Sequence, residues 1–333
     1  MDFAFNAALV RCGIVLAAGE GERLKPFVHR LRGDGLPKQY INFIGTRSML
    51  EHTFSRVEIL LPSERLFTVI SQRHLRYPEV REQLSSRPGE TIVVQPENKE
   101  TGPGLLLPLM HVYKRHPESA VAVFPSDHFV IEEGLFMAHV DLAFRVVERH
   151  PSYVVLLGME PEEPEPEYGY ILPGNKVARL APLSIHEVSR FVEKPPLHVA
   201  CELIKQGGLW NALVMVFKVG TLLKLVRRAA PALYRSFKRI EEAIGAPLME
   251  AVIKEVYQRM RPINFSRQVL EIVSAERPSH LLVLPVRGVH WCDWGSEQRI
   301  IRVLRKVGYL GGPHGVSEGK PLLTVQNRYA AGK

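Results

Sequence analysis

Residues 13–26 read GIVLAAGEGERLKP, in which a five-residue apolar run passes straight into a turn with two glycines. Short apolar runs rich in branched residues are typical of buried strands in parallel sheets. Glycines after such a strand let the backbone approach a ligand closely, and the helix that follows offers unpaired N–H groups to phosphate oxygens. The stretch therefore predicts a strand, a phosphate-binding turn and the start of a helix.

Similar apolar runs alternate with helical patterns through the first half of the chain. The further runs lie at residues 66–70, 91–95, 120–124 and 153–158. The helical patterns lie at residues 48–60, 104–115 and 134–149. Strands that alternate with helices indicate right-handed crossovers between neighbouring strands. We therefore predict an α/β fold with a doubly wound, mostly parallel, Rossmann-like mixed sheet that is flanked by helices.

The pattern changes after about residue 160. The stretch EPEEPEPEYGYILPG at residues 160–174 is acidic and rich in proline, and it predicts a surface loop that leads into a hairpin. Further strands are expected at residues 176–194, 209–218 and 281–286. Residues 219–260 are expected to be mainly helical with breaks at Pro231 and Pro247, and a last helix is expected at 296–306. The second half thus predicts a smaller β/α region.

The composition is ordinary for a globular protein, with 46% hydrophobic and 23% charged residues in a chain of 333. No stretch approaches the roughly 20 apolar residues that cross a bilayer. The first apolar run has no basic cluster before it and leads into a glycine turn, which favours a strand over a signal peptide. We therefore expect a cytoplasmic protein without a membrane partner.

The net charge of +8 is spread along the chain without runs that interleave basic and aromatic residues. A basic surface of this kind favours small polyanions such as triphosphates over nucleic acid. The three cysteines, Cys12, Cys201 and Cys292, lie far apart and not at metal-ligand spacing. They are expected to be reduced thiols.

Basic side chains accompany the glycine turn. Arg23 and Lys25 lie within it, and Lys38 follows in GLPKQY at residues 35–40. A dinucleotide-binding turn would carry glycine in place of Leu24, and a P-loop would need Gly-Lys-Ser/Thr. A tight structural turn beside solvated charges is the alternative. The ordered set of glycines and cations favours a triphosphate, whose cleavage builds charge on oxygen atoms.

Two aspartates lie at the ends of predicted strands. Asp127 follows the apolar run AVAVFPS, and Asp293 lies in WCDWGS after the strand at 281–286. Ligands of open α/β sheets bind at the carboxyl ends of strands, and one or two carboxylates can hold Mg²⁺ with substrate phosphates. Two structural roles remain open as alternatives. Asp127 could cap the next segment, and Asp293 could accept hydrogen bonds from backbone donors of its own turn. The adjacent His128 is expected to be structural.

The motifs together resemble those of a known family. They are LAAGEGERLKP (16–26), LPKQY (36–40), QPENKETGPG (95–104), FPSDH (124–128), EYGYILPG (167–174), FVEKP (191–195), LWN (209–211) and WCDWGS (291–296). In this order they resemble the nucleotide-sugar pyrophosphorylases, and among these the mannose-1-phosphate guanylyltransferases. The resemblance implies transfer of a nucleotidyl group from GTP to mannose 1-phosphate or a similar hexose 1-phosphate, with Mg²⁺ as cofactor and pyrophosphate as the second product.

The resemblance also implies roles for particular residues, and it allows a homodimer. Arg23, Lys38 and Asp127 would be catalytic, and Asp127 and Asp293 would share the metal. The nucleotide would be bound by Ala18, Gly19, Gly21, Gln95 and Asn98. The sugar phosphate would be bound by Gly169, Glu193, Lys194 and Asn211. Residues 1–305 would then be one catalytic domain, with a nucleotide-binding half at about 1–160, a sugar-phosphate half at about 161–305, and a tail at 306–333.

The sequence departs from the family pattern near the expected sugar pocket. Ala212-Leu213 follows Trp-Asn where the family usually has Ser-Gly, and Arg267 lies where the family tends to have an acidic residue. These changes remove a hydroxyl, add bulk and reverse a charge. Two alternatives therefore stay open, namely a glucose 1-phosphate transferase that uses UTP or dTTP, and a non-catalytic nucleotide-sugar-binding regulatory homologue.

Overall fold

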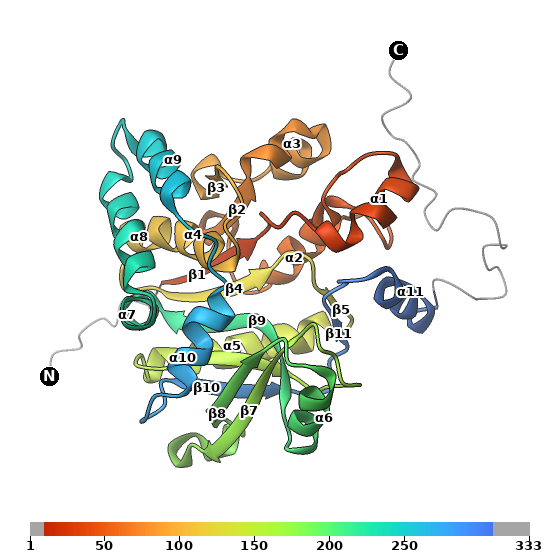
Figure 1. The fold of residues 1–333 in the computed structure, drawn as a ribbon, viewed down its shortest axis with the longest axis vertical. Coiled ribbons are helices and arrows are strands. Elements are labelled where there is room, and N and C mark those ends of the chain that lie inside the picture. Colours follow the sequence, from red (N-terminus) through yellow and green to blue (C-terminus); the bar gives the residue numbers. More distant parts are fainter. Residues whose placement is uncertain (1–9, 309–333) are drawn as a thin grey trace, which may run out of the picture.

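The computed structural model describes residues 10–308, apart from the side chains of residues 181 and 182. The tail predicted at 306–333 therefore lies largely outside the described residues. A nine-stranded mixed sheet runs through the described part in the order β3-β2-β1-β4-β9-β6-β10-β8-β7 (Figure 1). A separate two-stranded sheet pairs β11 with β5.

The strands are β1 (Arg11–Leu16), β2 (Leu66–Ser71), β3 (Ile92–Gln95), β4 (Ala120–Pro125), β5 (Phe129–Val130), β6 (Val154–Met159), β7 (Gly169–Lys176), β8 (His186–Glu193), β9 (Leu209–Lys218), β10 (Leu281–Val286) and β11 (Trp291–Cys292). The helices are α1 (Lys25–Arg32), α2 (Met49–Val57), α3 (Pro78–Leu84), α4 (Thr101–Arg115), α5 (Glu133–Arg149), α6 (Leu197–Lys205), α7 (Val219–Ala229), α8 (Pro231–Ala243), α9 (Met249–Arg259), α10 (Glu271–Ser274) and α11 (Glu297–Lys306).

The predicted α/β fold with a mixed sheet flanked by helices is confirmed. Strands β3, β2, β1 and β4 are parallel neighbours, and β6 pairs parallel with β10. Strand β9 lies between β4 and β6 and is antiparallel to both, and β7 and β8 form an antiparallel hairpin. The four neighbouring parallel strands thus all come from the first half of the chain, where the predicted strands alternate with helices.

Alternating side chains build one core on each face of the sheet. In β1, Cys12 and Ile14 belong to the cluster under α4, α7, α8 and α9, whereas Val15 belongs to the cluster under α1, α2 and α5. In β4, Val121 and Val123 face the first cluster and Phe124 faces the second. Successive residues of a strand point to opposite faces, so strands that are apolar throughout must be covered on both sides.

The strand predicted at 176–194 was wrong in its bounds. The hairpin begins earlier, at Gly169, and a 3-10 turn at Ala178–Leu183 separates β7 from β8. The early start follows from pairing, because Gly169 lies opposite both Glu193 of β8 and Asn211 of β9. The breaks predicted within 219–260 are confirmed, since Pro231 begins α8 and Pro247 lies between α8 and α9.

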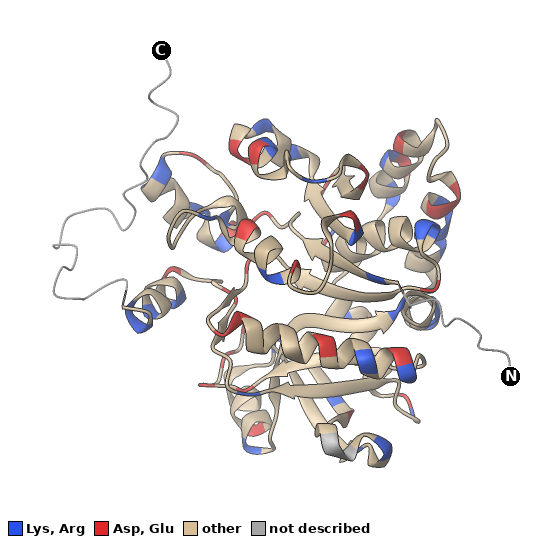
Figure 2. Ribbon diagram, turned by 180° about the vertical axis from the view of Figure 1, so that it is seen from behind, with Lys and Arg blue, Asp and Glu red and all other residues tan. Residues whose placement is uncertain are grey.

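Charged residues of both signs are mixed on the surface. Seen from behind, Lys and Arg lie among Asp and Glu on the same helices (Figure 2). Cys12, Cys201 and Cys292 are all free thiols, as expected. Between residues 10 and 308, the helices are too short or too polar for any of them to cross a membrane.

Candidate active site

A cleft of about 600 Å³, open to solvent, lies at the carboxyl ends of β1 and β4. It is lined by most of the residues that the sequence predicts for the site, namely Ala18, Gly19, Arg23, Lys38, Gln95, Asn98, Asp127, Gly169, Glu193, Lys194, Asn211 and Asp293. Gly21 instead lines a smaller adjoining hollow, which also includes Gly19, Arg23, Lys38 and Asp127. Residues from both halves of the chain thus meet around one cavity.

The glycine turn has a backbone conformation that favours glycine. Gly21 adopts a φ of 61°, in the left-handed region that strains other residues. A side chain there would also approach Lys38, because an added Cβ would lie 3.5 Å from its Cγ. A 3-10 turn at Glu22–Leu24 follows and leads into α1. The strand, turn and helix start predicted for residues 13–26 are therefore confirmed.

Lys38 joins three parts of the site. Its Nζ lies 3.0 Å from Oδ2 of Asp127. It also donates hydrogen bonds to the backbone carbonyls of Asp293 and Trp294, each at 3.0 Å. Only 8% of the residue is exposed. Lys38 thus holds the 293–294 turn through two hydrogen bonds and pairs its charge with Asp127 just after β4.

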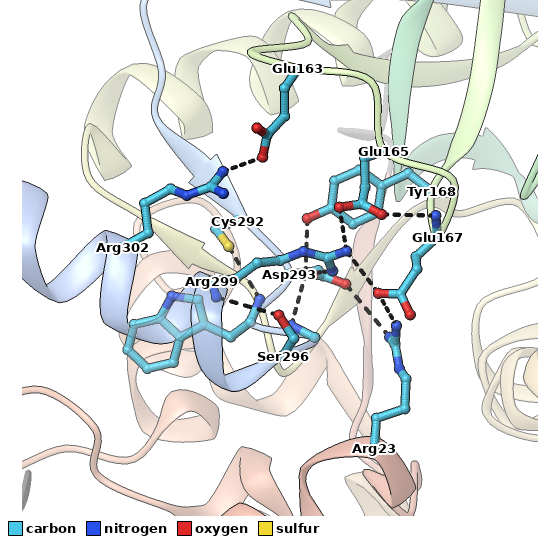
Figure 3. Close-up of polar contacts among 12 residues, drawn as sticks. Arg23, Glu163, Glu165, Glu167, Tyr168, Cys292, Asp293, Ser296, Arg299 and Arg302 are labelled. Carbon is cyan, nitrogen blue, oxygen red and sulfur yellow. Dashed lines mark hydrogen bonds and ion pairs between the residues drawn. The ribbon is translucent and has the colours of Figure 1, made fainter. Parts of the chain in front are cut away.

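Asp293 is the most heavily bonded carboxylate of the cleft (Figure 3). Its Oδ1 accepts hydrogen bonds from the hydroxyl of Tyr168 at 2.9 Å, from the N–H of Gly295 at 2.8 Å and from Nη1 of Arg299 at 2.8 Å. Burial alone would raise the pKa of the Asp293 carboxyl, but the charges of Lys38 and Arg299 outweigh it and lower this pKa. Asp293 is therefore ionised at neutral pH.

Arg23 forms ion pairs across the mouth of the cleft. Its Nη1 pairs with Glu167, and its Nη2 lies 3.9 Å from Oδ2 of Asp293. The side chain is 49% exposed. The guanidinium predicted to meet a triphosphate is thus held by carboxylates of the same protein.

Sequence reasoning missed a second arginine, Arg299 of α11. Its Nη2 lies 2.7 Å from carboxylate oxygens of both Glu165 and Glu167, and its guanidinium lies 4.7 Å from the ring centre of Tyr168. No local motif marks Arg299, and the two glutamates lie in the stretch that was predicted to be a surface loop. Only the fold brings α11 to this loop (Figure 3).

His128 is buried and neutral. Burial lowers its pKa to about 4, against the opposing pull of Asp127 and Asp293. Its ring packs edge-on against Trp291, with 4.9 Å between ring centres. Its Nε2 is 4.0 Å from the Asp127 carboxylate, which is too long for a hydrogen bond. This geometry agrees with the structural role expected for His128.

Gln95 and Asn98 lie at the predicted nucleotide side of the cleft. Gln95 ends β3 and is 1% exposed, and within the described part of the chain its Oε1 has no hydrogen-bond partner. The side chain of Asn98 accepts a hydrogen bond from the N–H of Glu100 at 2.9 Å and so shapes its own loop. Buried polar atoms usually have partners, so the unpaired Oε1 leaves Gln95 with unused bonding capacity beside the cleft.

Gly169, Glu193 and Asn211 lie side by side on β7, β8 and β9. A Cβ on Gly169 would lie 2.7 Å from Oε2 of Glu193 and 3.3 Å from Cβ of Asn211, so a side chain there would displace the Glu193 carboxylate. Lys194 follows with a φ of 51°. Burial raises the pKa of Glu193; Lys194 opposes this shift and Glu271 adds to it.

Leu213 lies in an irregular part of β9. The β6–β9 register runs from Leu156 opposite Met215 to Gly158 opposite Asn211, so Leu157 faces the three residues at 212–214. Leu213 itself has a φ of 52° and lines the cleft. Bulges of this kind occur next to active sites, where they redirect a side chain.

A glycine turn at a strand end, with cations and carboxylates around one cleft, defines a phosphate-binding α/β protein. The comparisons narrow this class. Residues 12–308 match the family model described as Nucleotidyl transferase, so the chain belongs to the nucleotidyl transferase family.

Individual proteins of similar sequence support the same assignment. The xanthan biosynthesis protein XanB of Xanthomonas campestris is 29% identical over 96% of this chain and 64% of its own length. A mannose-1-phosphate guanylyltransferase of Escherichia coli is 27% identical over 85% of this chain and 57% of its own length. The chain thus spans less than two thirds of the length of these relatives.

Solved structures share the fold. A Thermus thermophilus protein described as mannose-1-phosphate geranyltransferase has a TM-score of 0.73 and 28% identity, over 91% of this chain and 80% of that one. A mannose-6-phosphate isomerase of Helicobacter pylori has a TM-score of 0.65, over 85% of this chain and 100% of that one, at 19% identity. At 19% identity, the similarity to the Helicobacter pylori protein shows a shared fold alone.

Proposed function

We propose that this chain transfers a guanylyl group from GTP to mannose 1-phosphate and so makes GDP-mannose and pyrophosphate. The observation that carries the proposal is the single cleft lined by the glycine turn with Arg23, by the Asp127–Lys38 pair, and by the strand row of Glu193 and Asn211. A nucleotide and a sugar phosphate can meet in such a cavity. The guanylyltransferase relatives supply the choice of base and sugar.

The reaction needs no covalent intermediate on the enzyme. A phosphate oxygen of the sugar 1-phosphate attacks the α-phosphorus of the triphosphate and forms the new P–O bond. The bond between the α-phosphorus and the oxygen that bridges to the β-phosphorus breaks, and its electron pair leaves with pyrophosphate. Because both reactants are anions, placement and charge neutralisation carry most of the catalysis. Arg23 and Lys38 would stabilise the charge on the leaving oxygens.

Magnesium fits the residues that are present. Arg23, Lys38 and Arg299 face four carboxylates, those of Asp127, Asp293, Glu165 and Glu167, so the cluster carries a net charge of −1. Mg²⁺ relies on one or two carboxylates plus phosphates and water, and Asp127 and Asp293 line the same cleft. Asp127 and Asp293 would hold Mg²⁺, which would neutralise phosphate charge when bound.

The remaining residues would orient the two substrates. Gln95 has an amide that can read a base edge, and Asn98, Ala18, Gly19 and Gly21 would surround the nucleotide. Glu193 and Asn211 would bond sugar hydroxyls across Gly169, and Lys194 would pair with the phosphate of the sugar. We propose accordingly that residues up to about 160 serve the nucleotide and residues 161–305 the sugar phosphate.

A screen for pyrophosphate release tests the proposal. GTP, UTP and dTTP are each combined with mannose 1-phosphate and glucose 1-phosphate in the presence of Mg²⁺. We expect the GTP and mannose 1-phosphate pair to be fastest. If glucose 1-phosphate reacts faster with UTP or dTTP, the chain carries out the same type of reaction on these substrates instead. Tight GDP-mannose binding without pyrophosphate release from any pair would favour a regulatory homologue.

Leu213→Gly is expected to broaden the range of sugar 1-phosphates that react. Glycine accepts the φ of 52° without strain and removes an isobutyl group that lines the cleft. Pocket changes of one or a few carbons shift discrimination roughly 10-fold or more. We therefore expect the ratio of kcat/KM between mannose and glucose 1-phosphates to fall by about 10-fold. Leu213→Ala, which keeps the strain but trims the side chain, is the matched control. An unchanged ratio in both variants would contradict a role for Leu213 in the pocket.

Glu193→Gln is expected to stabilise the free protein at neutral pH. The raised pKa means that the folded state holds this proton more tightly than the unfolded state does, whose carboxyl has the ordinary value of 4.5. Stability from the protonated form is present below that value and is lost as the pH rises through the raised pKa. The Tm of the variant minus that of the wild type should therefore grow from pH 4 towards pH 7. A difference that shrinks over this range would refute the assignment.

A further inference from the structure

In the free protein, the guanidinium of Arg23 is already paired with a carboxylate. Its Nη1 pairs with Glu167, which lies on the loop that leads into β7 and not on the glycine turn (Figure 3). Both side chains are well exposed, at 49% for Arg23 and 40% for Glu167, and both line the cleft. Exposed ion pairs contribute little to stability, so this pair can exchange partners readily.

Glu167 is held in place by a second, more buried cation. Arg299 is only 11% exposed, and it bonds Glu167 and Glu165 through Nη2 and Asp293 through Nη1. These contacts do not depend on Arg23. If Arg23 turned to another anion, Glu167 would keep a charged partner and would stay at the edge of the cleft.

We propose that Glu167 holds the place of a substrate phosphate on Arg23, and that Arg299 is the positioning residue that keeps Glu167 there. The inference rests on the proposed function, in which a nucleoside triphosphate binds over the glycine turn. On binding, Arg23 leaves the carboxylate for a phosphate oxygen, and charge-assisted bonds to phosphate favour this exchange. The pair thereby keeps Arg23 at the mouth of the cleft in the free protein, but the Glu167 carboxylate competes with the substrate phosphate for Arg23.

The neighbouring Glu163 provides a matched comparison. It lies on the same acidic stretch and pairs with Arg302 of the same helix, α11. It lines a different cavity, which shares Tyr168 with the cleft. Its contact is with Arg302 and not with Arg23 (Figure 3). Glu163→Gln therefore removes the same charge from the same loop without freeing Arg23.

The experiment measures the Kd of GTP, and of inorganic tripolyphosphate as a base-independent probe, by calorimetry with excess Mg²⁺. We expect Glu167→Gln to lower both Kd values about fivefold or more, because Arg23 then keeps only its 3.9 Å contact with Asp293, and Glu163→Gln to leave them unchanged. In an Arg23→Ala background, Glu167→Gln should change neither Kd by more than about twofold. Where Arg23→Ala binds too weakly for calorimetry, the shift of Tm with millimolar tripolyphosphate makes the same comparison.

Two results would overturn the inference. One is an unchanged Kd in Glu167→Gln. The other is an equal gain in affinity from Glu167→Gln in the presence and absence of Arg23. Glu167 would then weaken binding only through its general negative charge. The part played by Arg299 is tested by repeating Glu167→Gln in Arg299→Met, where the gain should shrink, and in Arg299→Lys, where it should return. Failure of the wild type and of all variants to bind either probe would instead refute the proposed function.

Discussion

Asp127→Asn is expected to lower the rate of pyrophosphate release at least roughly 1000-fold while the protein stays folded. The change keeps the shape of the side chain but removes the charge that would hold Mg²⁺ at the reacting phosphates. It also weakens the contact between Lys38 Nζ and Asp127 Oδ2, which now spans 3.0 Å. The rate is measured with saturating substrates and Mg²⁺, and Tm reports the fold.

A matched control separates this effect from a general loss of carboxylate charge. Asp34 pairs with Arg32, outside the residues that line the cleft. Asp34→Asn should therefore keep near-normal rates. Near-normal rates in Asp127→Asn as well would remove Asp127 from the reaction.

Lys38→Met is expected to impair both activity and stability. The variant loses the cation beside Asp127, of which only 8% is exposed, and leaves the carbonyls of Asp293 and Trp294 without their donor. Unsatisfied buried acceptors cost about 1–3 kcal/mol each, so we expect the free energy of unfolding to fall by about 2–4 kcal/mol. Loss of a preorganised charge should lower kcat roughly 100-fold or more.

Urea unfolding and steady-state rates measure the two effects of Lys38→Met separately. Lys205→Met is the control, because Lys205 pairs with Glu202 on the surface of α6 and does not line the cleft. The control should be nearly neutral in both measurements. If Lys38→Met were as stable and as active as the control, Lys38 would not hold the 293–294 turn to Asp127.

The parts of the site that the sequence predicts without the family resemblance are those fixed by local chain geometry. The run at 13–17 followed by Gly19 and Gly21 predicts a strand, a turn and a helix, and the structure has all three. Asp127 could be placed because it follows a fully apolar strand, whose carboxyl end faces ligands in an open α/β sheet. Each of these predictions needs only a short stretch of chain and the period of its side chains.

The rest of the site depends on contacts between distant segments. Arg299 bonds Glu167 across a separation of 132 residues, and Lys38 bonds the carbonyl of Asp293 across 255. A run of Glu and Pro is most often a solvated loop, so nothing in residues 160–167 indicates that Glu165 and Glu167 turn inward. The predicted bounds of the strand at 176–194 were wrong for a similar reason, because the pairing of Gly169 with two neighbouring strands decides where β7 begins.

The most direct test of the account is whether pyrophosphate release depends on both substrates together. The wild-type chain is incubated with Mg²⁺ and GTP, with and without mannose 1-phosphate, and pyrophosphate and GDP-mannose are both quantified. The account predicts equal amounts of the two products when both substrates are present, and neither product when one is left out. Pyrophosphate formed without the sugar phosphate, or bound substrates that yield no product, would contradict it.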